Sequence, residues 1–269
     1  MKLPEPPAKR LCRLKLPGEK EKTTLCLPKP GSPGTSVSEA IKSGRLLLCY
    51  ITDRRQFAGS EDDQARQLLA KIQECAAAGV DFVQLREKDL GPRELEKLAT
   101  KAVAALPANT QTRLLVNSRI DVALACGAHG VHLPAGDLMA SEARAIWSRV
   151  RQNTCVIGVS AHSAGKIALA ESHGADFAVF APVFEKSGDS NPMGLEQLRQ
   201  ACQRSQAAVP PMPVLALGGV SLHNAAQCMA AGASGIAGIR LFQEMNAFTV
   251  VTTLRSQFAK HAGQGSSSL

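Results

Sequence analysis

Residues 79–90 read "GVDFVQLREKDL", and the order of elements that they contain recurs along the chain. The apolar residues from 80 to 83 are typical of a buried strand. Gln84, Arg86 and Lys88 then follow at every second position. Because alternate residues of a strand share one face, an amide, a guanidinium and an ammonium group are expected to point the same way. Either the strand ends in solvent or these groups reach into one site.

A glycine joint between helix and strand recurs along the chain. It follows the helical stretch 61–78 and returns at "ACGAHG", "SHGAD" and "AAGASG", and glycine favours the left-handed backbone that ends many helices. Ser221 is expected to cap a helix over 222–231. Eight apolar runs suited to strands alternate with the helical stretches: 46–52, 80–86, 113–117, 129–133, 155–160, 176–180, 213–219 and 234–240. We therefore predict an α/β fold, a single (β/α)8 TIM barrel, with a doubly wound open sheet as the alternative.

The composition limits the partners of the protein. The chain has 269 residues and a net charge of +8, of which +6 lies in residues 1–45. The remainder carries +2 and no basic stripe with interleaved aromatics, so nucleic-acid binding is not expected. No apolar run reaches the length of a membrane span, and the eight cysteines include no C-x-x-C pair. We predict free thiols and a cytoplasmic protein.

Three segments are predicted along the chain. Residues 1–44 are rich in proline and lysine and lack a sustained period, as is typical of a disordered basic tail. Residues 45–262 would form the catalytic barrel, and residues 263–269 a flexible C-terminus. The tail is either a dispensable extension or a docking arm for an anionic partner. A homodimer is compatible with the sequence.

Polar residues stand at the carboxyl ends of the predicted strands, where barrel enzymes hold their active sites. Gly218 and Gly219 would let a phosphate approach the backbone after the seventh strand, and loops seven and eight often bind phosphate through backbone N–H groups. Arg86 and Lys88 could hold a polyphosphate, unless Glu87 or Asp89 pairs with them at a solvated strand end. The residues alone predict a barrel enzyme for phosphorylated ligands.

Several segments together resemble the thiamine-phosphate synthase family, which also includes thiazole tautomerases on the same barrel. They are "YITDR", "GVDFVQLREKDL", "LLVNSRIDVALACGAHGVHLP", "IGVSAHS", "GADFAVFAPVF", "GLEQLR" and "VLALGGVSLHNAAQCMAAGASGIAGI". The resemblance implies a transferase of thiamine biosynthesis. That family joins a hydroxymethylpyrimidine diphosphate to a thiazole phosphate and releases diphosphate.

The resemblance also implies roles for residues at the strand ends, with catalysis depending on Ser160, Arg86 and Lys88. The implied sets are Gln84, Arg86, Lys88 and Asn117 for the pyrimidine diphosphate, His132 for the pyrimidine pocket, Ser160 for the diphosphate or leaving oxygen, Gly219, Ile239 and Arg240 for the thiazole phosphate, and Asp137 for Mg²⁺.

Two departures from the family pattern leave alternatives open. Ser118 stands where the family usually has an aspartate, so the Mg²⁺ site is expected to be weakened. The loop after the sixth strand lacks the usual Thr-x-Thr-Lys element and offers Lys186 instead. One alternative is a thiazole tautomerase with His162 as its acid or base. The other is a non-catalytic ligand-binding barrel.

Overall fold

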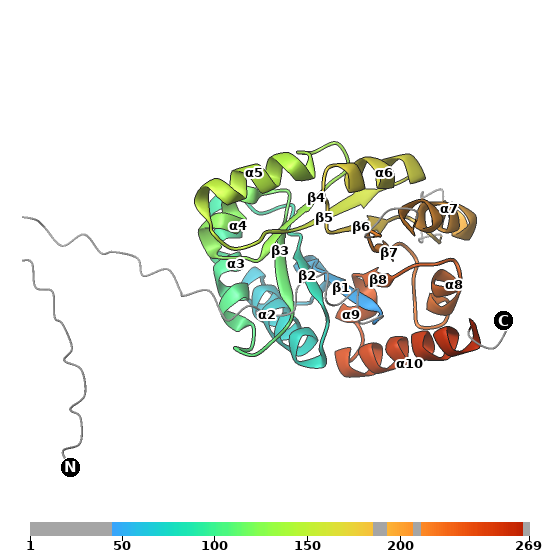
Figure 1. Ribbon diagram of the computed structural model, residues 1–269. Coiled ribbons are helices and arrows are strands. Elements are labelled where there is room, and N and C mark those ends of the chain that lie inside the picture. The colour runs from blue at the N-terminus through green and yellow to red at the C-terminus, as the bar shows by residue number, and fades with distance from the viewer. Residues whose placement is uncertain (1–44, 185–192, 207–210, 266–269) are drawn as a thin grey trace, which may run out of the picture. The chain divides into compact units, whose positions relative to one another are not determined.

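The structure is a computed structural model that describes residues 45–184, 193–206 and 211–265 (Figure 1). Three predictions fall wholly or partly outside these ranges: the disordered tail 1–44, the flexible C-terminus 263–269, and the role of Lys186 in the loop after the sixth strand.

Eight parallel strands close into a barrel in which each strand pairs with the next in the sequence and β8 pairs with β1 (Figure 1). The strands are β1 (Leu47–Ile51), β2 (Phe82–Leu85), β3 (Arg113–Asn117), β4 (Gly130–Leu133), β5 (Val156–Ala161), β6 (Phe177–Phe180), β7 (Val214–Ala216) and β8 (Gly235–Gly238). Seven of the predicted runs contain one strand each, and the run 155–160 covers β5 except for its last residue, Ala161. The predicted (β/α)8 fold is confirmed, and closure excludes the open sheet.

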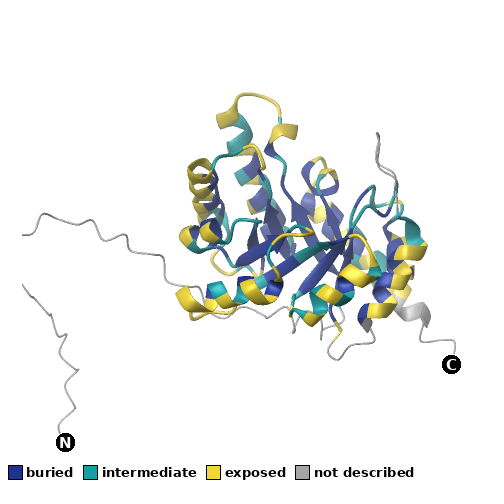
Figure 2. Ribbon diagram, turned by 90° about the horizontal axis from the view of Figure 1, so that it is seen from above, coloured by how far each residue is buried: buried dark blue, intermediate teal, exposed yellow. Residues whose placement is uncertain are grey.

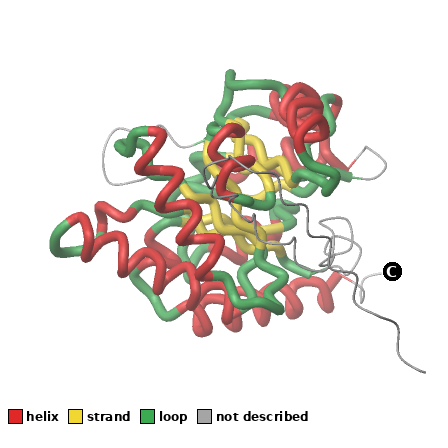
Figure 3. The backbone as a smooth tube through the Cα atoms, turned by 90° about the vertical axis from the view of Figure 1, so that its left-hand side faces the viewer, coloured by secondary structure: helices red, strands yellow, loops and turns green. Residues whose placement is uncertain are grey.

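Helices surround the strands, as Figure 3 shows with the barrel in yellow and the helices in red. They are η1 (Arg54–Gln56), α2 (Glu61–Ala78), α3 (Pro92–Ala105), α4 (Ile120–Cys126), α5 (Ala140–Val150), α6 (Ala164–Ser172), α7 (Gly194–Gln206), α8 (Ala225–Ala230), α9 (Arg240–Gln243) and α10 (Ala247–Gly265). The joint glycines Gly79, Gly127, Gly174 and Gly232 all have φ between 75° and 97°. This is the left-handed backbone expected where a helix stops and the chain turns into a strand.

The alternation of side chains divides the core in two, and Figure 2 shows the strands as the most deeply buried part. Val83 and Leu85 pack outward against the helices, whereas Phe82 faces into the barrel. There the ring of Phe82 stacks on Phe177, with 4.5 Å between the ring centroids. Gln84 lies two residues further along the same face, so the stacked rings form the floor beneath the polar end of β2.

Six cysteines in the described part of the chain are buried and free. Burial raises the pKa of thiols such as Cys75 and Cys202 to about 12, which keeps them protonated and unreactive at neutral pH. Within the described ranges, no helix combines the length and the apolar character that a membrane crossing requires.

Candidate active site

The amide of Gln84 lies at the top of the barrel interior, where β2 meets β3. Its side chain is buried, and Nε2 donates a hydrogen bond of 2.8 Å to Oδ1 of Asn117. The other amide atom, Oε1, is buried without a partner. Because buried polar atoms are nearly always paired, this oxygen is a candidate acceptor for a ligand N–H. The structure thus brings Gln84 and Asn117 together, as the sequence predicted.

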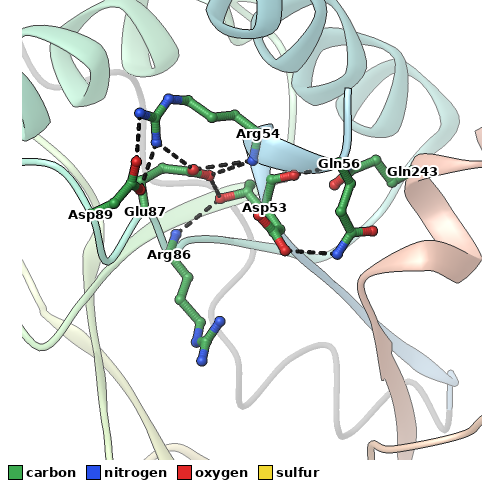
Figure 4. A network of polar contacts seen from close by, with 8 residues as sticks. Asp53, Arg54, Gln56, Arg86, Glu87, Asp89 and Gln243 are labelled. Carbon is green, nitrogen blue, oxygen red and sulfur yellow. Dashed lines mark hydrogen bonds and ion pairs between the residues drawn. The ribbon is translucent and has the colours of Figure 1, made fainter. Parts of the chain in front are cut away.

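Arg86 and Lys88 continue from β2 into the following loop. Arg86 is half-buried and Lys88 is exposed. Neither forms an ion pair with another described residue, because Glu87 and Asp89 both bind Arg54 instead. Figure 4 shows the Arg86 side chain pointing away from this cluster. The alternative of Arg86 and Lys88 paired with Glu87 or Asp89 is therefore wrong, and both cations remain available to a ligand.

His132 of β4 and Ser160 of β5 form a second polar pair. The His132 ring is buried, its Nε2 lies 3.0 Å from Ser160 Oγ, and its Nδ1 has no partner. Burial lowers the pKa of His132 to about 3, with a smaller contribution from the charge of Arg86, so the ring is neutral. A proton on Nδ1 would leave a buried donor unpaired. We therefore place it on Nε2, which donates to Ser160 and leaves the hydroxyl hydrogen free for a ligand.

The predicted metal position, Asp137, lies beside Ser118. The Ser118 hydroxyl donates to Asp137 Oδ2, while the Leu138 N–H donates to Oδ1 at 2.9 Å. Asp137 is exposed, and the Ser118 backbone has a positive φ of 65°. Mg²⁺ commonly binds through one or two carboxylates plus substrate phosphate oxygens and water, so this donor set fits a site that the substrate completes. No group of three or more His, Cys, Asp or Glu in the described ranges is placed to hold a metal by itself.

The seventh and eighth strands end in the predicted phosphate loops. Gly218 and Gly219 have φ values of 95° and 63°. A Cβ on Gly218 would lie 2.7 Å from Cα of Pro182, so the close approach of the two loops requires glycine there. Ile239 caps α9 and Arg240 begins it, where the first N–H groups of a helix lack internal partners. Both loops lie at the same end of the barrel as Gln84.

His162 lies in the exposed turn after β5. Its Nδ1 is 2.6 Å from the carbonyl oxygen of Ala181. Since a carbonyl only accepts, Nδ1 carries the proton, and Nε2 of the neutral ring is an acceptor. No hydrogen bond joins His162 to the Gln84 or His132 pairs.

Sequence reasoning missed one part of this region, the buried ion pair of Arg54 and Glu87. The side chains are 4% and 1% exposed. The signal that could have found it lies in the quoted stretch: Glu87 and Asp89 stand at odd positions, and these point away from the face of Gln84 and Arg86.

Known proteins of similar sequence and structure identify the family of this chain. Residues 48–242 match the family model described as thiamine monophosphate synthase. The chain belongs to the thiamine monophosphate synthase family. A relative in this family from Geobacter sulfurreducens, named a putative thiamine-phosphate synthase, is 42% identical over 193 residues, which cover 71% of this chain and 83% of the relative. A thiamine-phosphate synthase from Methanoregula boonei is 40% identical over 198 residues, covering 72% and 84% of the two chains.

One similar solved structure carries a name of the same kind. Thiamine phosphate pyrophosphorylase from Pyrococcus furiosus has a TM-score of 0.64 and 27% sequence identity. The match covers 80% of this chain and 96% of that one. The resemblance predicted from the sequence motifs is therefore confirmed.

Proposed function

We propose that this member of the thiamine monophosphate synthase family is a transferase that joins hydroxymethylpyrimidine diphosphate to thiazole phosphate and releases diphosphate. The observation that carries the proposal is the end of β2, where Gln84 is buried and Arg86 and Lys88 follow in the next loop. It begins with a buried amide whose Oε1 is unpaired and ends with two cations that no described residue neutralises. An aminopyrimidine that carries a diphosphate has the complementary order, with an N–H donor at one end and anionic oxygens at the other.

The reaction breaks one bond and forms one. The C–O bond between the pyrimidine methylene and the diphosphate breaks, and its electron pair leaves with the diphosphate. The lone pair of the thiazole nitrogen then forms the new C–N bond to the methylene carbon. No protein nucleophile is needed, so catalysis rests on alignment of the two substrates and on stabilisation of the departing charge.

Three side chains are assigned to the departing charge. Arg86 and Lys88 would bind the diphosphate oxygens, the guanidinium through its fork and the ammonium as a mobile point charge. Ser160 would donate its hydroxyl hydrogen to the leaving oxygen, since its own oxygen accepts from the neutral His132 ring at 3.0 Å. His132 is thus assigned to the orientation of Ser160 as well as to the wall of the pyrimidine pocket.

Asp137, with Ser118 beside it, would hold Mg²⁺ together with diphosphate oxygens. When bound, the ion neutralises part of the diphosphate charge. With a single carboxylate in the donor set, Arg86 and Lys88 would carry a larger share of that neutralisation. At the other side of the barrel mouth, Gly219, Ile239 and Arg240 would hold the thiazole phosphate through backbone N–H groups.

The test is formation of thiamine phosphate from both substrates with Mg²⁺, followed by chromatography and mass spectrometry. Arg86→Ala is expected to lower kcat/KM by at least about 100-fold, because it removes a charge-assisted contact to the leaving group. Arg149→Ala, which removes an exposed arginine from the last turn of α5, is the matched control and is expected to leave the rate unchanged. Absence of product at every Mg²⁺ concentration would contradict the synthase, and tight substrate binding without turnover would favour a non-catalytic barrel.

One observation favours a second candidate, a thiazole tautomerase. The bond between His162 Nδ1 and the Ala181 carbonyl fixes an exposed imidazole with Nε2 as the acceptor, the form that a general base requires. Isomerisation of the thiazole phosphate carboxylate by the wild type, with loss of that activity in His162→Ala, would support it. Isomerisation that survives this substitution would exclude His162.

The cytoplasmic location, the homodimer, the disordered tail 1–44 and the flexible end 263–269 remain predictions from the sequence. If the tail is dispensable, deletion of residues 1–43 is expected to leave activity and substrate affinity unchanged. A loss of either would favour the docking arm.

A further inference from the structure

A network of buried polar side chains lies beside the proposed substrate contacts and is separate from them (Figure 4). Thr52 is fully buried at the end of β1, and Glu87 and Gln243 are 5% and 7% exposed. Polar groups at this depth nearly always have hydrogen-bond partners, and each of these three has them. The contacts converge on the short turn that follows β1 and begins η1.

One half of this network holds the loop after β2 in place. Glu87 Oε1 accepts from the Thr52 hydroxyl at 2.6 Å, and its Oε2 accepts from the Arg54 backbone N–H at 3.0 Å. The Arg54 guanidinium also reaches Glu87 Oε2 at 3.2 Å and both Asp89 oxygens at 2.7 and 2.8 Å. These contacts secure the odd positions of the stretch that carries Arg86 and Lys88.

The Thr52 hydroxyl makes a second bond that reaches Arg86 itself. While it donates to Glu87, it accepts from the Arg86 backbone N–H at 2.9 Å. The backbone position from which the Arg86 guanidinium extends is therefore set by the hydroxyl of the residue that follows β1, and that hydroxyl is held by the carboxylate of the neighbouring Glu87.

The other half of the network holds the phosphate loop after β8 in place. Gln243, the last residue of α9, donates from Nε2 to the Asp53 carbonyl at 2.7 Å. Its Oε1 accepts from the Tyr50 hydroxyl at 3.0 Å. Since α9 begins at Arg240, directly after the proposed phosphate contact Ile239, the same turn holds the loops after β2 and β8.

We propose that Thr52, Glu87 and Gln243 are positioning residues that hold the diphosphate loop and the phosphate loop in fixed relation to each other through the turn after β1. The proposal rests on the proposed function, because it takes those two loops as the anion sites of the two substrates. It assigns separate effects to the two halves. Loss of the Thr52 hydroxyl weakens binding of the pyrimidine diphosphate, and loss of the Gln243 amide weakens binding of the thiazole phosphate.

The test uses the full chain and two pairs of substitutions. Thr52→Val removes the hydroxyl and keeps the shape, whereas Thr52→Ser keeps the hydroxyl. We expect the KM for the pyrimidine diphosphate to rise about tenfold in Thr52→Val, consistent with loss of a pair of hydrogen bonds, and to return to within about threefold of wild type in Thr52→Ser. Gln243→Leu is expected to raise the KM for the thiazole phosphate by a similar factor and to leave the other KM within about twofold.

The readout separates positioning from stability. Thermal unfolding shows whether each variant folds, and only folded variants enter the comparison; a Thr52→Val that fails to fold is replaced by Glu87→Gln, with the same expected shift. Equal changes in both KM values, or a lower Tm with unchanged kinetic constants, would overturn the proposal.

A failure of the proposed function gives a different result. If the wild type forms no thiamine phosphate, binding of inorganic diphosphate is measured by calorimetry. A loss of about tenfold in Thr52→Val with recovery in Thr52→Ser would support the positioning role without the reaction. Equal affinities, or no binding to the wild type, would overturn it.

Discussion

Arg54→Ala removes one partner of the buried ion pair between η1, which follows β1, and the loop after β2. The Arg54 side chain is 4% exposed and the Glu87 side chain 1% exposed, so the substitution leaves a carboxylate in a site that water does not reach. Breaking a buried pair in this way typically costs about 3–5 kcal/mol.

The local contacts place the expected cost at the lower end of that range. Glu87 keeps two donors in the variant, the Thr52 hydroxyl at 2.6 Å and the backbone N–H of residue 54 at 3.0 Å. Asp89 also loses its partner, but its side chain is 34% exposed and water can replace the bond. We expect a loss of about 3 kcal/mol in the free energy of unfolding, or a fall in Tm of about 6–12 °C for a barrel of this size.

Urea unfolding, monitored by circular dichroism, measures the loss in the free energy of unfolding. Two further variants identify its cause. Glu87→Gln in the Arg54→Ala background removes the unpaired charge and keeps the shape, so it is expected to restore about 2 kcal/mol. Arg66→Ala is the matched control, because Arg66 pairs with Asp63 at the surface and is 76% exposed. It is expected to cost less than about 1 kcal/mol.

Two outcomes would refute this reasoning. A cost for Arg54→Ala no larger than that of Arg66→Ala would show that the pair is not desolvated. A double variant no more stable than Arg54→Ala would show that the unpaired charge is not the source of the loss.

Three further predictions follow from individual contacts. A Cβ at Gly158 would lie 2.4 Å from Phe177 Cζ, so Gly158→Ala is expected to lower the free energy of unfolding, measured in urea, by about 1–3 kcal/mol. Gly165→Ala is the control and should cause no loss, because the nearest atom to its Cβ would lie at 3.9 Å. Equal effects of the two substitutions would contradict the tight packing at Gly158. Ser118→Asp is expected to tighten Mg²⁺ binding about tenfold in calorimetry with inorganic diphosphate, and unchanged affinity would remove the metal role of the neighbouring carboxylate. Burial lowers the pKa of His132 from 6.5 to about 3, so as pH falls below 6.5 the unfolded chain binds a proton that the folded chain does not. His132 is therefore expected to lower the free energy of unfolding by up to about 1.4 kcal/mol for each pH unit below 6.5. In His132→Gln the free energy of unfolding should depend less steeply on pH between pH 7 and 4.5, and an identical slope would contradict the assignment.

The fold could be predicted from the sequence because its signals are local. Each strand is an apolar run, and each joint glycine stands within three residues of the helix it ends. The inward position of Gln84 likewise needs no knowledge of distant residues, since a strand separates odd from even positions by its geometry, whereas Arg86 and Lys88 lie beyond the last residue of β2.

The sequence indicates that Glu87 and Asp89 point away from Gln84, but their pairing with Arg54 could not be predicted, because the partners lie far apart along the chain. Glu87 and Asp89 are 33 and 35 residues further on, and nothing local shows that an arginine after a strand will be buried.

The helix over 222–231 was predicted wrongly at its start for a different reason, which is local. The structure begins α8 at Ala225, because the Asn224 side chain accepts from the Ser221 N–H at 2.8 Å and donates to the Gly219 carbonyl at 2.9 Å. This holds residues 221–224 as a turn, and the expected hydroxyl cap at Ser221 is not formed.

The division of labour within residues 84–89 has a consequence for the evolution of this barrel. Attachment to the scaffold rests on Glu87 and Asp89, while Arg86 and Lys88 make no ion pair with any described residue. Exchange of either cation therefore removes no described ion pair, so new ligand preferences could arise there with little cost to folding. An insertion of one residue between positions 84 and 87 would move Glu87 and Asp89 out of register with Thr52 and Arg54, and so detach the loop that carries Arg86 and Lys88. Residues 84–89 are thus expected to tolerate substitution of Arg86 and Lys88 but not the insertion or deletion of a residue.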